Sequence, residues 1–286
     1  MATQTFDPLK YKEVQRTDWS TAAAGWRAWW PKIEKAIGPV SEHLVELAEI
    51  KSGDRVLDIA TGIGEPAVTA ARRAGPDGRV VATDIAPGML EIGRERAAEL
   101  GLGSIEFQEA DAEELSLPDE HFDVALSRFG LMFFPDLGAA LDKIRNALVP
   151  GGRLAAAVWG PPERVPMIAV PLQTVARELE LPPPAPGTPG PLTLSDADAL
   201  EAKVRASGFD DVRTERRNVT APWDSPNEFV RFMQAISAPL NNLLAEQSPE
   251  RREEVWRAIE DAMARQAETD GSLRLENEVI YLTARR

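Results

Sequence analysis

Three aspartates in the first half of the chain stand where a short strand is expected to end. Asp58 and Asp84 each close an apolar, β-branched segment, and Asp111 lies just beyond a third one. An ionised carboxylate offers two oxygens that accept hydrogen bonds from a bound ligand. The turn 60–64 follows Asp58 and contains two glycines, which allow the backbone to approach a ligand closely. Pro66 then begins a helix, whose free N–H groups favour a nucleotide, so the pattern predicts a nucleotide-binding loop.

Two classes of nucleotide site compete for this loop. A dinucleotide fold requires G-x-G-x-x-G after the strand and an acid about 20 residues later. Gly62 and Gly64 supply two glycines and Asp84 supplies the acid, but the third glycine is missing and Asp58 precedes the turn. An NAD-linked oxidoreductase is therefore disfavoured but stays an alternative function for the same fold.

Five segments, in order, resemble the signatures of class I S-adenosylmethionine-dependent methyltransferases. The first is Asp58-x-Ala60-x-Gly62-x-Gly64, in which alanine replaces the first glycine. Residues 50–160 are most similar to the ubiquinone/menaquinone-biosynthesis C-methyltransferases, through Ala60 and the step Phe129-Gly130-Leu131. Ala60 also leaves open a non-catalytic cofactor-binding or partner-binding domain. The remaining signature segments are 83–90, 109–112, 122–129 and 148–154.

The resemblance implies S-adenosylmethionine as the cofactor and gives the aspartates their roles. Asp58 would help to hold the methionine amino group, Asp84 both ribose hydroxyls, and Asp111 the adenine amino group. Asp111 is also a natural cap for the short helix after it. The other residues expected to contact the cofactor are Ala60, Thr61, Gly62, Gly64, Ile85, Met89, Ala112 and Ser127.

The catalytic residue is not fixed by the sequence, and the candidates are Arg128 and Glu65. Arg128 follows the fourth strand, where it could pair with a carboxylate of a lid or bind an acidic or oxygen-rich acceptor. Glu65 follows the glycine turn. The acceptor is expected to be a small, largely apolar molecule, and the sequence leaves open whether its carbon, oxygen or nitrogen is methylated. Candidates for the acceptor pocket are Trp26, Trp30, Arg128, Phe129, Phe229 and Met233.

Neither histidine is a convincing general base. His121 precedes the fourth strand and is therefore expected at the edge of the sheet opposite the cofactor, while His43 lies in a remote helix. A proton of the acceptor would have to go to a carboxylate, to Tyr11 or Tyr281, or to water. In-line transfer from a sulfonium depends mainly on positioning, and a base adds roughly 10²–10⁴-fold where a proton is lost.

Alternating strands and helices must position these residues. Because right-handed crossovers place the carboxyl ends of parallel strands at one edge, Asp58, Asp84, Asp111 and Ser127 should gather there. We expect an α/β fold, a Rossmann-like, doubly wound seven-stranded sheet, mostly parallel with the last strand antiparallel, and helical cap insertions. Strands are predicted at 55–59, 79–83, 105–109, 122–127, 152–159, 211–219 and 278–284, and core helices at 66–74, 87–100, 112–115, 137–147 and 196–207.

The predicted organisation has four parts. Residues 1–50 form an N-terminal helical arm or lid, with 1–17 irregular, a helix over 20–37 broken at Pro31, and a second helix over 40–50 capped by Ser41. Its tryptophans either pack on the core or cover the cofactor. Residues 51–160 form the cofactor-binding core. A cap insertion with a proline-rich loop follows at 161–195, and 196–286 completes the core with a helical cap insertion at 222–270, where helices are predicted at 226–236 and 249–267.

The amino-acid composition limits the classes of binding partner and of chemistry that this protein can have. A net charge of −14 argues against sequence-independent nucleic-acid binding and against an anionic membrane surface. With no cysteine, disulfides and thiolate chemistry are impossible. No run approaches the ~20 apolar residues of a membrane helix, no signal peptide is recognisable, and no carboxylate constellation for a catalytic metal stands out. A cytoplasmic enzyme with a small-molecule acceptor and no metal is expected, and its oligomeric state is open.

Overall fold

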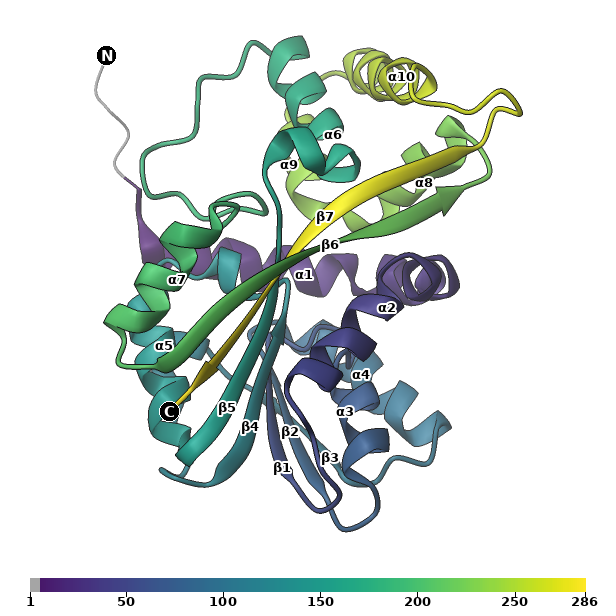
Figure 1. The fold of residues 1–286 in the computed structure, drawn as a ribbon. Coiled ribbons are helices and arrows are strands. Elements are labelled where there is room, and N and C mark those ends of the chain that lie inside the picture. The colour runs from purple at the N-terminus through teal and green to yellow at the C-terminus, as the bar shows by residue number, and fades with distance from the viewer. Residues whose placement is uncertain (1–5) are drawn as a thin grey trace.

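The computed structural model describes residues 6–286 and is built on one seven-stranded sheet. The strand order is β3-β2-β1-β4-β5-β7-β6 (Figure 1). The first five strands are parallel, and β7 is antiparallel to both β5 and β6. The predicted fold class, with its antiparallel last strand, is confirmed. The strands are β1 Arg55–Ile59, β2 Arg79–Asp84, β3 Ile105–Glu109, β4 Phe122–Arg128, β5 Leu148–Trp159, β6 Asp210–Trp223 and β7 Leu273–Arg285.

Helices cover both faces of the sheet. In Figure 1, α2, α3 and α4 lie on one face, and α5 and α7 lie on the other. The central strands β1 and β4 are therefore buried on both sides and read as nearly continuous apolar runs. Their side chains Leu57 and Leu126 are fully buried, and this rigid floor fixes the residues at its end, Asp58 and Arg128. The helices of the two faces are α2 Trp30–Leu47, α3 Ala67–Ala74, α4 Pro87–Glu99, α5 Leu137–Ala147 and α7 Ala197–Ala206.

The N-terminal arm differs from its prediction. Helix α1 spans Pro8–Ala28, so the expectation of an irregular segment is wrong for residues 8–17, while residues 1–5 lie outside the described part. Asp7 caps α1 by accepting hydrogen bonds from the N–H groups of Leu9 and Lys10. The break falls at Trp29, and α2 then runs unbroken through Pro39. Ser41 is consequently buried inside α2 and is not a helix cap.

The cap stands above the carboxyl ends of the strands (Figure 1). Strands β6 and β7 are longer than predicted because they pair with each other beyond β5, as far as Trp223 and Leu273. The ribbon that they form carries the three helices between them, of which α9 was not predicted. Among residues 6–286, no helix combines the length and apolar character needed to cross a membrane. The cap helices are α6 Pro166–Glu178, α8 Pro226–Ile236, α9 Ala238–Ala245 and α10 Pro249–Ala264, and short 3₁₀ turns are Ala112–Glu114, Leu131–Phe133 and Pro162–Arg164.

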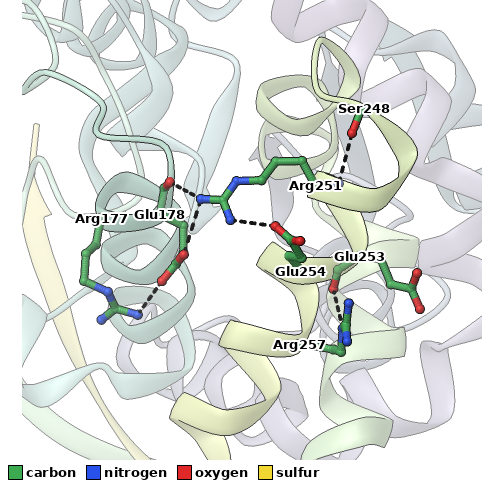
Figure 2. Close-up of polar contacts among 7 residues, drawn as sticks. All are labelled: Arg177, Glu178, Ser248, Arg251, Glu253, Glu254 and Arg257. Atoms are coloured by element: carbon green, nitrogen blue, oxygen red, sulfur yellow. Dashed lines mark hydrogen bonds and ion pairs between the residues drawn. The ribbon is translucent and has the colours of Figure 1, made fainter.

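A polar clip joins α6 to α10 (Figure 2). Arg251 of α10 donates to the backbone carbonyl of Glu178, at the last turn of α6, and lies 3.4 Å from the carboxylate of the same residue. Glu254 holds the guanidinium from the other side at 3.0 Å. Ser248 caps α10 by accepting from the Arg251 N–H. The clip fixes two cap helices that are about 70 residues apart in sequence.

Candidate functional site

Asp58 is the buried anchor of the glycine turn. Its Oδ2 accepts hydrogen bonds from Thr61 Oγ1 at 2.6 Å and from the Ala67 N–H at 2.9 Å, which ties the turn to the start of α3. Its Oδ1 is buried and has no partner within the described chain. Burial raises the pKa of this carboxyl to about 7, although the two donors and Arg128 act in the opposite direction.

The backbone of the turn is left-handed at three positions. Ala60, Gly62 and Gly64 have φ of 57°, 56° and 95°. Alanine adopts this region at a cost of roughly 1–2 kcal/mol, so Ala60 retains the conformation that glycine would take in the family signature. Gly130 leaves space for the Ala60 methyl, because a β-carbon on Gly130 would lie 2.6 Å from it. The departure at Ala60 therefore leaves the loop intact.

Asp84 links the turn to α4. Its Oδ2 accepts from the Gly62 N–H at 2.8 Å, and its Oδ1 accepts from the Ala86 N–H at 2.9 Å. Burial raises the pKa of Asp84, while the N–H groups of Ala86, Gly62 and Ile85 oppose the rise. Each oxygen keeps a further lone pair, so the carboxylate can still accept from a diol. Ile85 and Met89 line the cavity next to it.

Helix α1 reaches the far end of the site. Asp111 Oδ1 accepts from the Glu113 N–H at 2.9 Å, so it caps the 3₁₀ turn as expected, and its Oδ2 lies 2.7 Å from Lys12 Nζ. Lys12 also pairs with Glu113. Sequence reasoning missed Lys12 because the polar segment 8–17 was not recognised as helix. The pair Asp7-Pro8, a cap followed by proline at the first helical position, was the available signal.

A cavity of about 300 Å³ runs along this edge of the sheet, beneath the cap. Most residues predicted to hold the cofactor line it. Three do not. Asp58 supports Thr61 from below, Ser127 Oγ donates to the Ile59 carbonyl at 3.0 Å, and Gly64 packs against Phe107. The predicted residues on the cavity wall are Ala60, Thr61, Gly62, Asp84, Ile85, Met89, Asp111 and Ala112.

The other end of the cavity is mostly aromatic and aliphatic. Of the predicted acceptor-pocket residues, Trp26, Arg128, Phe129 and Met233 line it. Phe229 lies one layer behind, against the Trp223 ring. Trp30 is absent from this wall; the Arg96 guanidinium lies 3.8 Å over its ring, and Trp30 lines a separate outer cleft. Wall residues that were not identified as pocket candidates from the sequence include Trp19, Trp159, Met132, Trp223, Ile236 and Pro239.

Arg128 and Glu65, the two predicted catalytic candidates, both line the cavity. Arg128 Nη1 donates to Ser41 Oγ at 2.7 Å, and burial lowers the pKa of its guanidinium while Glu65 and Asp58 oppose that effect. Glu65 Oε2 accepts from Thr69 Oγ1 at 2.8 Å, and its Oε1 lies 3.7 Å from Arg96. Glu65 lines both the cavity and the outer cleft.

The two tyrosines and two histidines considered as general bases lie in different parts of the fold. Tyr11 lines the cavity and its hydroxyl donates to the Pro189 carbonyl at 3.4 Å, but burial raises the pKa of its phenol above the usual range. Tyr281 is buried against His43, and burial raises its pKa to about 12. His121 is exposed just before β4, at the opposite edge of the sheet as expected, and His43 is half-buried. Both phenols are therefore poorly suited to accept a proton near neutral pH.

Comparison with known proteins agrees with this geometry. Residues 56–152 match a family model described as a methyltransferase domain. The ubiquinone/menaquinone biosynthesis C-methyltransferase UbiE of Pseudomonas putida is 47% identical over 111 residues, which are 38% of this chain and 43% of that protein. The chain thus spans less than half the length of the first curated relatives that it matches.

Two solved structures share the fold. The YcgJ protein of Bacillus subtilis superposes with a TM-score of 0.56 at 20% identity, over 86% of this chain and 97% of that one. Phosphoethanolamine N-methyltransferase 2 of Haemonchus contortus, solved in complex with S-adenosyl-L-methionine, gives 0.52 at 20% identity, over 90% and 52%. At this identity the likeness shows the fold alone.

The fold, the turn and the matched domain define a class I S-adenosylmethionine-dependent methyltransferase core. The residues present fit that cofactor. Gly62 leaves open space where a side chain would stand, Asp58 holds an unpartnered buried oxygen, and Asp84 and Asp111 line the same cavity. S-Adenosylmethionine is thus the cofactor of this core, and the matched methyltransferase domain favours it over the NAD-linked alternative.

Proposed function

We propose that this protein transfers a methyl group from S-adenosylmethionine to a small, largely apolar acceptor beneath the cap. The observation that carries the proposal is the continuity of one cavity, from Asp84 at the glycine turn to Phe129, Trp223 and Met233 at the cap. Apolar walls with a few polar groups are typical of small-molecule sites. In this proposal, residues 51–160 bind the cofactor. The segments that cover it are 1–50, 161–195 and 222–270.

The chain's own residues supply position and exclude water. Asp84 would accept from the ribose hydroxyls and Asp111 from the adenine amino group, while the turn 60–64 would lie against the methionine part. When bound, S-adenosylmethionine supplies a methyl group already activated on a positively charged sulfur. The aromatic walls would orient the acceptor for in-line attack, a contribution worth up to roughly 7–11 kcal/mol. Where the acceptor must lose a proton, Glu65 on the cavity wall or water would take it.

The cap itself must guide the choice of acceptor. The matched domain ends at residue 152, before α6 and before the insertion between β6 and β7. The curated relatives are named for ubiquinone and menaquinone biosynthesis, and the aromatic walls Trp159 and Trp223 would stack on a flat ring. An aromatic ring bearing hydroxyl or carbonyl oxygens is therefore the first acceptor class to test.

Thermal unfolding with added ligands tests the cofactor. A ligand at 100 times its Kd adds about 2.7 kcal/mol to the free energy of unfolding, so S-adenosylmethionine and S-adenosylhomocysteine should each raise the Tm by several degrees. Asp84→Ala should abolish the rise, and NADH should cause none. A rise with NADH alone would overturn the proposal.

Transfer of a labelled methyl group then tests the acceptor. Dihydroxynaphthalenes and substituted phenols should accept label, whereas a mixed peptide library and transfer RNA should not. Transfer to the macromolecules but not to the aromatic compounds would contradict the proposed acceptor class and leave the cofactor assignment standing.

A further inference from the structure

Arg128 is a buried cation without an anion. The residue is only 9% exposed and lines the cavity. One guanidinium nitrogen donates to the neutral Ser41 hydroxyl. Within residues 6–286, no carboxylate lies at ion-pair distance from Arg128, whereas Arg96, the other buried arginine, lies near Glu65. A buried charge is normally paired, so this guanidinium is suited to an anionic ligand in the cavity.

The order of the strands indicates which part of the cofactor lies next to Arg128. Along the edge β3-β2-β1-β4, the chain places Asp111, Asp84, the glycine turn and Arg128 in that sequence. A cofactor with its adenine at Asp111 and its ribose at Asp84 must extend its third part over the turn toward β4. That part is an amino acid, with one ammonium and one carboxylate.

The charges around Arg128 complement such a group. Glu65 lies on the cavity wall at the end of the turn, and Asp58, with its free Oδ1, lies beneath the turn. Both act on Arg128 electrostatically without reaching it. The cavity wall therefore offers one positive group, Arg128, and, separated from it, the carboxylate of Glu65. A guanidinium fork matches a carboxylate geometrically, and it keeps its charge at any ordinary pH.

We propose that Arg128 binds the α-carboxylate of the cofactor, with Ser41 of α2 holding the guanidinium in place, and that Glu65 on the cavity wall faces the α-ammonium. This assignment rests on the proposed cofactor site. It makes Arg128 a binding residue for the cofactor, not a group that acts on the acceptor. It also gives α2 a function, because the helix reaches the cofactor through Ser41.

Calorimetric titration with two ligands measures how much the cofactor carboxylate contributes to binding affinity. S-Adenosylmethionine and decarboxylated S-adenosylmethionine share the adenosine, the sulfonium and the ammonium, and differ only in the carboxylate. The wild-type protein should bind the first at least on the order of 30-fold more tightly, as is usual when one partner of a buried charge pair is removed. Arg128→Met should bind both with similar Kd, and Arg128→Lys should keep part of the difference, because lysine is a point charge.

Two further variants distinguish carboxylate binding by Arg128 from a general loss of ligand binding or of folding. Asp84→Ala should weaken both ligands by the same factor, since both carry the ribose. Ser41→Ala, which keeps the arginine but frees it, should reduce the difference between the ligands without abolishing it. The Tm of each variant without ligand reports folding, and if Arg128→Met does not fold, Arg128→Lys and Ser41→Ala decide.

The outcomes distinguish the inference from the proposed function. If the wild type binds neither ligand, the proposed cofactor site fails. If it binds both but the preference for the carboxylate survives in Arg128→Met, the inference is overturned, and an acid on the acceptor becomes the partner of Arg128. Equal weakening of both ligands by Arg128→Met would also overturn it and would assign the arginine to packing.

Discussion

Lys12 Nζ of α1 lies 2.7 Å from Asp111 Oδ2, directly beside the expected place of the adenine. The ammonium also contacts Glu113, and the neighbouring Arg16 pairs with Glu109 at the end of β3. These ion pairs fasten the first turns of α1 over one end of the cavity. Helix α1 is held further along by Arg27, which pairs with Glu95 and Glu99 of α4.

Lys12→Ala should speed the release of S-adenosylhomocysteine. Partly buried ion pairs of this kind contribute roughly 1 kcal/mol, so the dissociation rate should rise about fivefold at low salt. Stopped-flow displacement of the bound ligand measures this rate. Arg16→Glu and Glu109→Arg, which do not touch the cavity, should each speed release, and the double variant should restore it. Rates that do not change in any of these variants would show that α1 does not control release.

Asp58 should make stability depend on pH. Its pKa is about 7 in the folded protein and near 3.8 when the chain is unfolded, so between these values the folded state binds more protons. The free energy of unfolding therefore falls as pH rises from about 4 to about 7 through this group. Asp58→Asn removes the titration and keeps an acceptor for the Ala67 N–H.

The comparison of the two proteins isolates that effect. Without ligand, the Tm of Asp58→Asn relative to wild type should increase across the same pH range and then level off above about pH 8. The other carboxylates titrate in both proteins and cancel in the difference. A Tm difference that stays constant with pH would contradict a protonated Asp58 in the folded state.

Gly25→Ala should move α1 away from α8. A β-carbon at this position would collide with the backbone carbonyl oxygen of Ala235, which cannot yield as a flexible side chain would. Overpacking of this kind costs typically 1–3 kcal/mol, and because Trp26 of α1 lines the cavity, S-adenosylhomocysteine should also bind more weakly. Thermal unfolding and calorimetry measure the two effects.

Gly38→Ala in α2 is the matched control. Its β-carbon would meet only Glu34 Cγ at 3.5 Å, an ordinary contact. Replacing glycine in a helix interior stabilises it by roughly 0.5–1 kcal/mol, so the Tm should rise slightly while ligand affinity stays the same. Equal behaviour of the two variants would argue against close packing of α1 on α8.

Arg251→Ala should loosen the cap without touching the cavity. The clip of Figure 2 joins α10 to Glu178 at the end of α6, and its loss removes the hydrogen bond and the ion pair that Arg251 makes between the two helices. We expect a lower Tm and faster proteolysis between α6 and α7. Arg257→Ala is the control, because within residues 6–286 its side chain donates a hydrogen bond only to the Glu253 carbonyl of its own helix. Equal protease sensitivity of both variants would count against the clip.

The core was predictable because its signals are local. Strands such as 55–59 and helices such as 137–147 show their burial directly in residue type and spacing, and both have the predicted bounds. The arm and the cap were harder. Residues 8–17 form helix without a strong apolar stripe, and β6 and β7 are extended by pairing with each other, which no local pattern reveals. Trp159 and Trp223 reach the cavity only because the strands end where they do.

The pairing of Trp223 with Leu273 has a consequence for engineering. The chain leaves the sheet after one of these residues and returns at the other, so residues 224–272 begin and end side by side. A segment with adjacent ends can be exchanged as a module, in the manner of an inserted domain. Transplanting a different 224–272 segment onto the same ribbon would redesign the acceptor chamber while the glycine turn, Asp84 and Arg128 keep their places.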